Sequence, residues 1–109
     1  MEHLWERLAD GTIDAICSDH TPVDDDEKLL PFAEASPGAT GLELLLSLTL
    51  KWAEELHGDA ALVRALGKIT SQAARTAGLD AGHLAPGAAA DIVVFDPDVR
   101  WQVNGAALA

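Results

Sequence analysis

The chain has 109 residues, of which 49% are apolar, and it carries 18 acidic against 7 basic side chains. The resulting formal net charge of −11 argues against nucleic acid and anionic membranes as partners, because both would repel it. No apolar run reaches the ~20 residues that a membrane-spanning helix needs, and the first residues do not resemble a signal peptide.

The first predicted elements are a short helix and a strand. Residues 3–9 carry apolar side chains at helical spacing, and Gly11 can supply a left-handed C-terminal stop. Residues 13–18 (IDAICS) are mostly apolar without alternation, which is typical of a strand buried on both faces. The single cysteine, Cys17, lies inside this run, so we expect a buried, unreactive thiol in a reducing cytoplasm.

The predicted strand ends abruptly at an Asp-His pair. Asp19 and His20 follow it directly, and Pro22 prevents the chain from continuing as a central strand. A β/α-barrel presents reactive carboxylates in this way, at the C-terminal ends of its buried strands. Asp19 is therefore a candidate catalytic residue, with an ordinary loop-capping role as the alternative.

A long loop and three helices are predicted next. Residues 19–39 contain three prolines and an acidic cluster, which we interpret as a solvated loop. A capping-box spacing over residues 40–43 overlaps an apolar run over 42–52, which predicts a helix buried on more than one side. Two shorter helices are predicted next, one with Asp59 as a possible N-cap and one with either Thr70 or Ser71 as a possible N-cap.

The character of the sequence changes near residue 80. Residues 92–95 (IVVF) form a β-branched run, and residues 99–103 alternate apolar and polar side chains as a half-buried strand does. We therefore predict an α/β fold, with an α/β part over residues 1–80 and a β segment over 81–109. The chain is far shorter than the ~250 residues of an eight-stranded barrel, so a barrel would imply a fragment. A plain small α/β domain without a site is the alternative.

Three separated segments carry a family resemblance. They are residues 18–22 (SDHTP) with Glu27-Lys28 following, residues 35–43 (ASPGATGLE) and residues 82–96 (GHLAPGAAADIVVFD). In this order and spacing they resemble the dihydroorotases of the amidohydrolase superfamily. The resemblance implies a C-terminal fragment of a TIM-type (β/α)8 barrel over residues 1–80, followed by part of a small β-sandwich over 81–109.

The resemblance also implies roles for single residues. Asp19 matches the aspartate that ends strand eight of the family barrel, binds the metal site and serves as general base and then general acid. Pro37 and Gly38 match the loop whose main chain contacts dihydroorotate, with an ordinary turn as the alternative. His20 is expected to hold the loop by hydrogen bonding. The family uses zinc, but its other ligands have no counterpart here, so we expect this chain alone to bind no metal and to be inactive.

One position departs from the family pattern. Val23 stands where active dihydroorotases commonly have a histidine that contacts the substrate carboxylate, and losing such a charge-assisted hydrogen bond costs about 1.5–3 kcal/mol. The leading expectation is a metal-dependent amidohydrolase of pyrimidine biosynthesis that interconverts N-carbamoyl-aspartate and dihydroorotate. The alternatives are a non-catalytic paralogue that assembles with aspartate carbamoyltransferase, and an allantoinase or hydantoinase. Uncovered apolar faces also predict self-association of the isolated chain.

Overall fold

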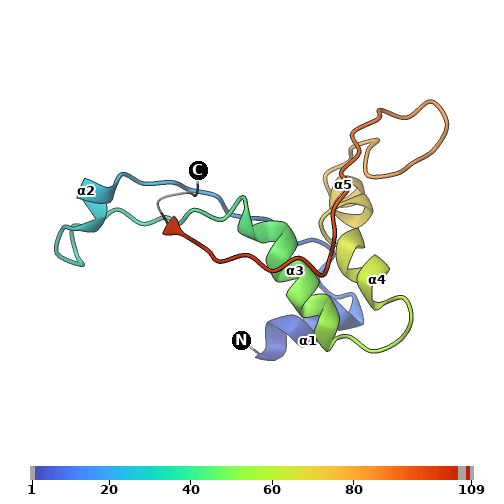
Figure 1. Cartoon of the computed structure of the whole chain (residues 1–109), viewed down its shortest axis with the longest axis horizontal. Helices are drawn as coiled ribbons and strands as arrows, with labels where there is room; N and C mark the ends of the chain where they lie inside the picture. Colours follow the sequence, from blue (N-terminus) through green and yellow to red (C-terminus); the bar gives the residue numbers. More distant parts are fainter. Residues whose placement is uncertain (1, 106–107, 109) are drawn as a thin grey trace.

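Helices joined by long extended segments make up the computed structural model, which describes residues 2–105 and 108 (Figure 1). The helices are α1 (Glu2–Asp10), α2 (Asp25–Lys28), α3 (Leu44–Glu55), α4 (Ala61–Gly67) and α5 (Ser71–Thr76). Residues 18–42 project from the other helices as an extended hairpin with α2 near its tip, and we call this segment the motif hairpin (Figure 1). The radius of gyration is 16.5 Å, whereas a compact domain of this length has about 13 Å.

The hydrophobic core lies between α1, α3 and α4. Leu8 on α1, Trp52 and Ala53 on α3, and Ala65 on α4 form one buried cluster. The Trp5 ring stacks on Trp52, with ring centroids 6.1 Å apart and planes inclined by 23°. Stacked aromatic pairs contribute about 0.5–1.5 kcal/mol beyond the area that they bury. Trp52 is the largest side chain of this cluster, so the packing of the helices depends mainly on it.

Two basic side chains at the C-terminal end of α4 attach the beginning of the chain to the helices. Arg64 Nη2 donates to the carbonyl of Ala9 at 2.9 Å, and the buried Lys68 donates through Nζ to the carbonyl of Ile13. The backbone N–H of Ile16 donates to the carbonyl of Lys68 at 2.9 Å. The segment that leads into the motif hairpin therefore bonds to the end of a helix.

The strands predicted from the sequence are not formed within the described residues, which are helical or without regular structure, so the β part of the predicted α/β fold is not confirmed here. Residues 13–18, 92–95 and 99–103 are extended, but the described part of the chain lays no second strand beside them. A strand satisfies its backbone groups by pairing with a neighbour, and a sequence pattern alone cannot supply one. Cys17 is correspondingly exposed, which corrects the expectation of a buried thiol.

The predicted helices form, but their N-termini differ from the prediction. The helix α3 begins at Leu44 with Glu43 as its N-cap, three residues later than the Thr40 N-cap that the capping box predicts. Ala60, rather than the predicted Asp59, is the N-cap of α4. Thr70 is the N-cap of α5, yet its hydroxyl donates to the carbonyl of Leu66 at 2.7 Å and leaves the α5 amides uncapped by it. At Thr70, a local hydrogen bond to the preceding helical turn thus replaces the predicted cap.

The C-terminal segment, by which we mean residues 95–103, lies along α3 (Figure 1). Trp101 Nε1 donates to Ser47 Oγ at 3.3 Å, and Arg100 pairs with Glu54 at 3.4 Å. A groove of about 640 Å³ lies between this segment and α3, and leucines form much of its lining. No helix within residues 2–105 is both long and apolar enough to cross a membrane.

Candidate active site

Two of the motifs lie side by side in the motif hairpin: the first, which contains the Asp-His pair (residues 18–22), and the second, which contains Pro37 and Gly38 (residues 35–43). The backbone N–H of Thr21 donates to the carbonyl of Ala39 at 3.0 Å. His20 Nδ1 accepts hydrogen bonds from the backbone N–H groups of Gly41 and Leu42, at 3.2 and 3.3 Å. An imidazole nitrogen that accepts is unprotonated, so the ring proton of a neutral His20 is on Nε2. The expected loop-holding role of His20 is confirmed, and the Asp-His motif lies against the second motif.

Asp19 occupies a strained position at the start of the hairpin. Its φ is +46°, and it is the one non-glycine residue with positive φ in the described part of the chain. This conformation costs roughly 1–2 kcal/mol for a residue with a side chain, although aspartate tolerates it better than most. The Thr21 hydroxyl donates to the Asp19 carbonyl at 3.2 Å, and Asp19 is solvent-exposed. The structure thus presents an exposed carboxylate on a strained turn, a type of position that is enriched at functional sites.

Gly38 packs directly against the part of the hairpin that precedes α2, which we call the first arm. Its φ is +137°, and a Cβ at this position would lie 2.5 Å from the carbonyl oxygen of Thr21 and 2.8 Å from Val23 Cγ2. Both the backbone angle and the space therefore require glycine. Pro37, the other predicted substrate-contacting residue, is exposed beside it. The structure also places Val23, the position that departs from the family pattern, in contact with the predicted substrate loop.

Lys28 is a residue of the hairpin to which the sequence motif assigned no role. It lies in α2, and its Nζ donates to the carbonyls of Ser36 and Gly38 at 2.8 and 2.7 Å. These distances are typical of charge-assisted hydrogen bonds. The only sequence signal for this contact is that Lys28 belongs to the first motif, because no spacing rule predicts which carbonyls a lysine will reach.

The described residues do not fit a zinc ion by themselves. Within residues 2–105 and 108, no three His, Cys, Asp or Glu side chains come together in a group that could hold a metal. Catalytic zinc sites have three protein ligands and keep a fourth position for water or substrate. Asp19 supplies at most one ligand, so a metal site would need ligands besides those that this chain brings together.

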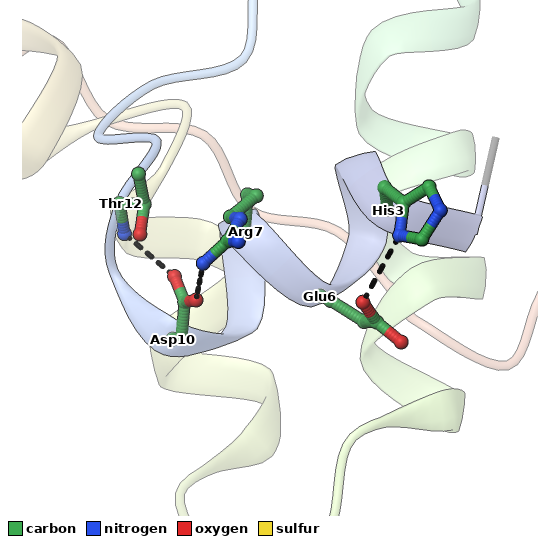
Figure 2. Close-up of polar contacts among 5 residues, drawn as sticks. All are labelled: His3, Glu6, Arg7, Asp10 and Thr12. Atoms are coloured by element: carbon green, nitrogen blue, oxygen red, sulfur yellow. Dashed lines mark hydrogen bonds and ion pairs between the residues drawn. The ribbon is translucent and has the colours of Figure 1, made fainter.

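A separate polar cluster lies on the surface of α1 and just beyond its C-terminal end (Figure 2). Hydrogen bonds from Thr12, and then from Arg7, hold the pKa of the Asp10 carboxyl below its ordinary value. The Thr12 N–H donates to Asp10 Oδ1 at 2.8 Å, and Arg7 Nη1 lies 3.0 Å from Oδ2 (Figure 2). One helical turn earlier, His3 Nδ1 lies 3.5 Å from Glu6 Oε2 (Figure 2). All these contacts are local to the helix and its end, so they stabilise α1 rather than form a site.

Comparison with known proteins decides the family. The profile of the amidohydrolase family matches residues 1–108. The chain belongs to the amidohydrolase family. Its sequence is 46% identical over 104 residues to a dihydroorotase of Geobacter metallireducens, a match that covers 95% of this chain and 24% of that protein. It is 46% identical over 108 residues to a dihydroorotase of Citrifermentans bemidjiense, covering 99% of this chain and 25% of that protein.

A third relative agrees with these two. A dihydroorotase of Anaeromyxobacter dehalogenans is 44% identical over 103 residues, which are 94% of this chain and 23% of that protein. No solved structure matches. This amidohydrolase chain spans about a quarter of the length of the curated relatives that it matches. The resemblance to dihydroorotases predicted from the three motifs is confirmed, whereas the roles of Asp19, Pro37 and Gly38 stay predictions.

Proposed function

We propose that this chain is the part of a dihydroorotase-type amidohydrolase that carries its substrate loop and its proton-transferring aspartate. The observation that carries this proposal is the motif hairpin, in which one backbone hydrogen bond and two bonds from backbone amides to the His20 ring join the Asp-His motif to the segment that contains the Pro-Gly motif. The substrate class is a cyclic amide. The reaction is the reversible opening of dihydroorotate to N-carbamoyl-aspartate in pyrimidine biosynthesis.

Asp19 is proposed to move the proton in this reaction. As a carboxylate it accepts a proton from the water that attacks the ring carbonyl, and it then donates that proton to the ring nitrogen as the C–N bond breaks. General acid–base catalysis of this kind contributes roughly 10²–10⁴-fold to a rate. The main chain at Pro37 and Gly38 is proposed to contact the ring, since a glycine allows close backbone approach.

The proposal extends to the fold of the whole protein. Residues 1–80 are proposed to be the end of a TIM-type barrel, and residues 81–109 part of a β-sandwich. The extended segments 13–18 and 92–95 support this, because their backbone groups are suited to pairing with strands from elsewhere in the protein. The zinc of the family would be held mainly by ligands outside this chain, with Asp19 as one of its contacts. A cytoplasmic location and self-association of the isolated chain complete the proposal.

Val23 favours a second candidate function. Its side chain borders Gly38 at the position where the resemblance implies a carboxylate-binding histidine. A hydrophobic side chain there suits a ring without a carboxylate, as in an allantoinase or hydantoinase. It equally suits a non-catalytic subunit that supports aspartate carbamoyltransferase.

A chimeric enzyme tests these functions directly. The matching quarter of the Geobacter metallireducens dihydroorotase is replaced by this chain, and turnover of dihydroorotate, hydantoin and allantoin is measured against the unaltered enzyme. We expect turnover of dihydroorotate. A chimera that melts cooperatively but prefers hydantoin or allantoin would support the second enzyme class, and one that turns over none of the three would support the non-catalytic function.

A further inference from the structure

Lys28 in α2 donates hydrogen bonds to backbone carbonyls on both sides of Pro37. We propose that Lys28 is a positioning residue, which fixes the backbone of residues 36–38 in the conformation that the second motif presents to its substrate. The structural half of this proposal rests on the geometry alone. The catalytic half rests on the proposed function of the hairpin.

The geometry of Lys28 is specific. One ammonium group donates to two carbonyls, those of Ser36 at 2.8 Å and Gly38 at 2.7 Å, which belong to residues on either side of Pro37. A lysine ammonium has three donors and can make both bonds at once. Two bonds from one cation restrict the loop more than either bond alone, because they fix the separation as well as the direction of the two carbonyls.

Apolar packing contributes little to the conformation of this part of the hairpin. All four residues of α2 are exposed, and the neighbouring Leu29 and Phe32 are 85% and 100% exposed. The turn that follows α2 is closed by local backbone bonds from Glu34 and Ala35 to the carbonyl of Pro31. The bonds from Lys28 therefore connect α2 to the second arm, the part of the hairpin that follows α2. Buried apolar contacts do not make this connection.

Fixing the Gly38 carbonyl has a consequence for recognition. A peptide group is planar, so holding this carbonyl also sets the direction of the Ala39 N–H across the same peptide bond. The carbonyl of Ala39 is bound in turn by the Thr21 N–H at 3.0 Å. Lys28 and Thr21 together thus orient consecutive peptide groups of the loop, and Lys28 acts on substrate through this backbone rather than by touching it.

The structural half is tested on the 109-residue chain by amide hydrogen exchange measured with NMR. Lys28→Met removes both bonds, Lys28→Arg keeps a cation with several donors, and Lys51→Met is the matched control on the exposed surface of α3. We expect Lys28→Met to speed exchange of the Thr21 amide about tenfold, as loss of a hydrogen-bonded contact predicts. Lys28→Arg should restore most of the protection. Equal exchange in Lys28→Met and Lys51→Met would overturn the proposal.

The catalytic half is tested by placing the same three substitutions in the chimera. We expect Lys28→Met to raise KM for dihydroorotate about tenfold, with kcat changed less than about twofold, because uniform binding is lost rather than transition-state stabilisation. An unchanged KM despite faster exchange would show that loop position does not control binding. An inactive chimera would count against the proposed function alone, because the exchange measurement does not depend on turnover.

Discussion

The helices and the motif hairpin are held together by different forces. The packing of α1, α3 and α4 depends on a buried cluster that contains Trp52 and Leu8. The hairpin is fixed by hydrogen bonds that His20 accepts and Lys28 donates, and by the close approach of Gly38 to the first arm. Because a few polar contacts hold the hairpin, single substitutions there should act locally, whereas substitutions in the core should act on the whole chain.

The largest expected effect tests the core side of this comparison. Trp52→Ala should destabilise the helices by about 3–5 kcal/mol, because it removes the largest buried side chain. The measurement is denaturant unfolding followed by circular dichroism. Trp101→Ala is the matched control, since Trp101 is 48% exposed, and it should cost below about 1 kcal/mol. Equal losses in the two variants would contradict the assignment of the core to Trp52.

A smaller effect is expected at the close approach in the hairpin. Gly38→Ala should weaken the hairpin by up to about 3 kcal/mol, because the new Cβ meets the Thr21 carbonyl and the backbone angle is strained. Exchange of the Thr21 amide measures this loss. At Gly87, φ is +88° and the described residues leave open space around a Cβ. Gly87→Ala should therefore show only the cost of the backbone angle, about 1 kcal/mol, and an equal cost at both sites would rule out the close contact.

His20 provides the next test, at the junction of the hairpin with α3. His20→Ala should cost about 1–2 kcal/mol locally, because the Gly41 and Leu42 amides lose their acceptor. His20→Asn supplies an amide oxygen near the position of Nδ1 and should recover much of that loss. Chemical shifts and exchange of these two amides report the result. If Asn performs no better than Ala, the acceptor is not what stabilises the junction.

The smallest effect concerns the surface of α1. Thr12→Val removes the hydroxyl and keeps the backbone donor, so the pKa of Asp10 should rise partway toward its ordinary value. A carboxyl whose pKa is lower in the folded state stabilises the fold above its unfolded pKa, and this contribution is lost as pH falls through the folded pKa. The variant should therefore lose less stability on acidification. Carbon-13 NMR titration of the Asp10 carboxyl measures the shift, with Thr76→Val as the control.

Local features of the fold were predictable from the sequence. The helices at residues 3–9, 42–52 and after Thr70 were recognisable from apolar spacing, although their starts differ by up to a few residues. The predicted left-handed stop at Gly11 is confirmed, with φ of +86°. These features depend on interactions within one helical turn, which a short stretch of sequence contains.

Non-local features were predicted less well, for physical reasons. The strand over residues 13–18 carries the right pattern, but a strand requires a neighbour that the described residues do not supply. The start of α3 differs from the capping-box prediction, and the amides of Gly41 and Leu42 instead donate to His20, some twenty residues earlier, a contact that no local pattern encodes. The contacts of Lys28 depend on how the loop returns past α2, which no local pattern encodes.

We propose that Asp19 of the motif hairpin is the proton-transferring residue of an amidohydrolase. The most direct test is dihydroorotate turnover by the chimera with and without Asp19→Asn, a substitution that keeps the size of the side chain and tolerates the positive φ. We expect a loss of at least about 100-fold in kcat, with exchange of the Thr21 amide unchanged. Turnover that survives Asp19→Asn would contradict the claim and assign proton transfer to a residue outside the hairpin.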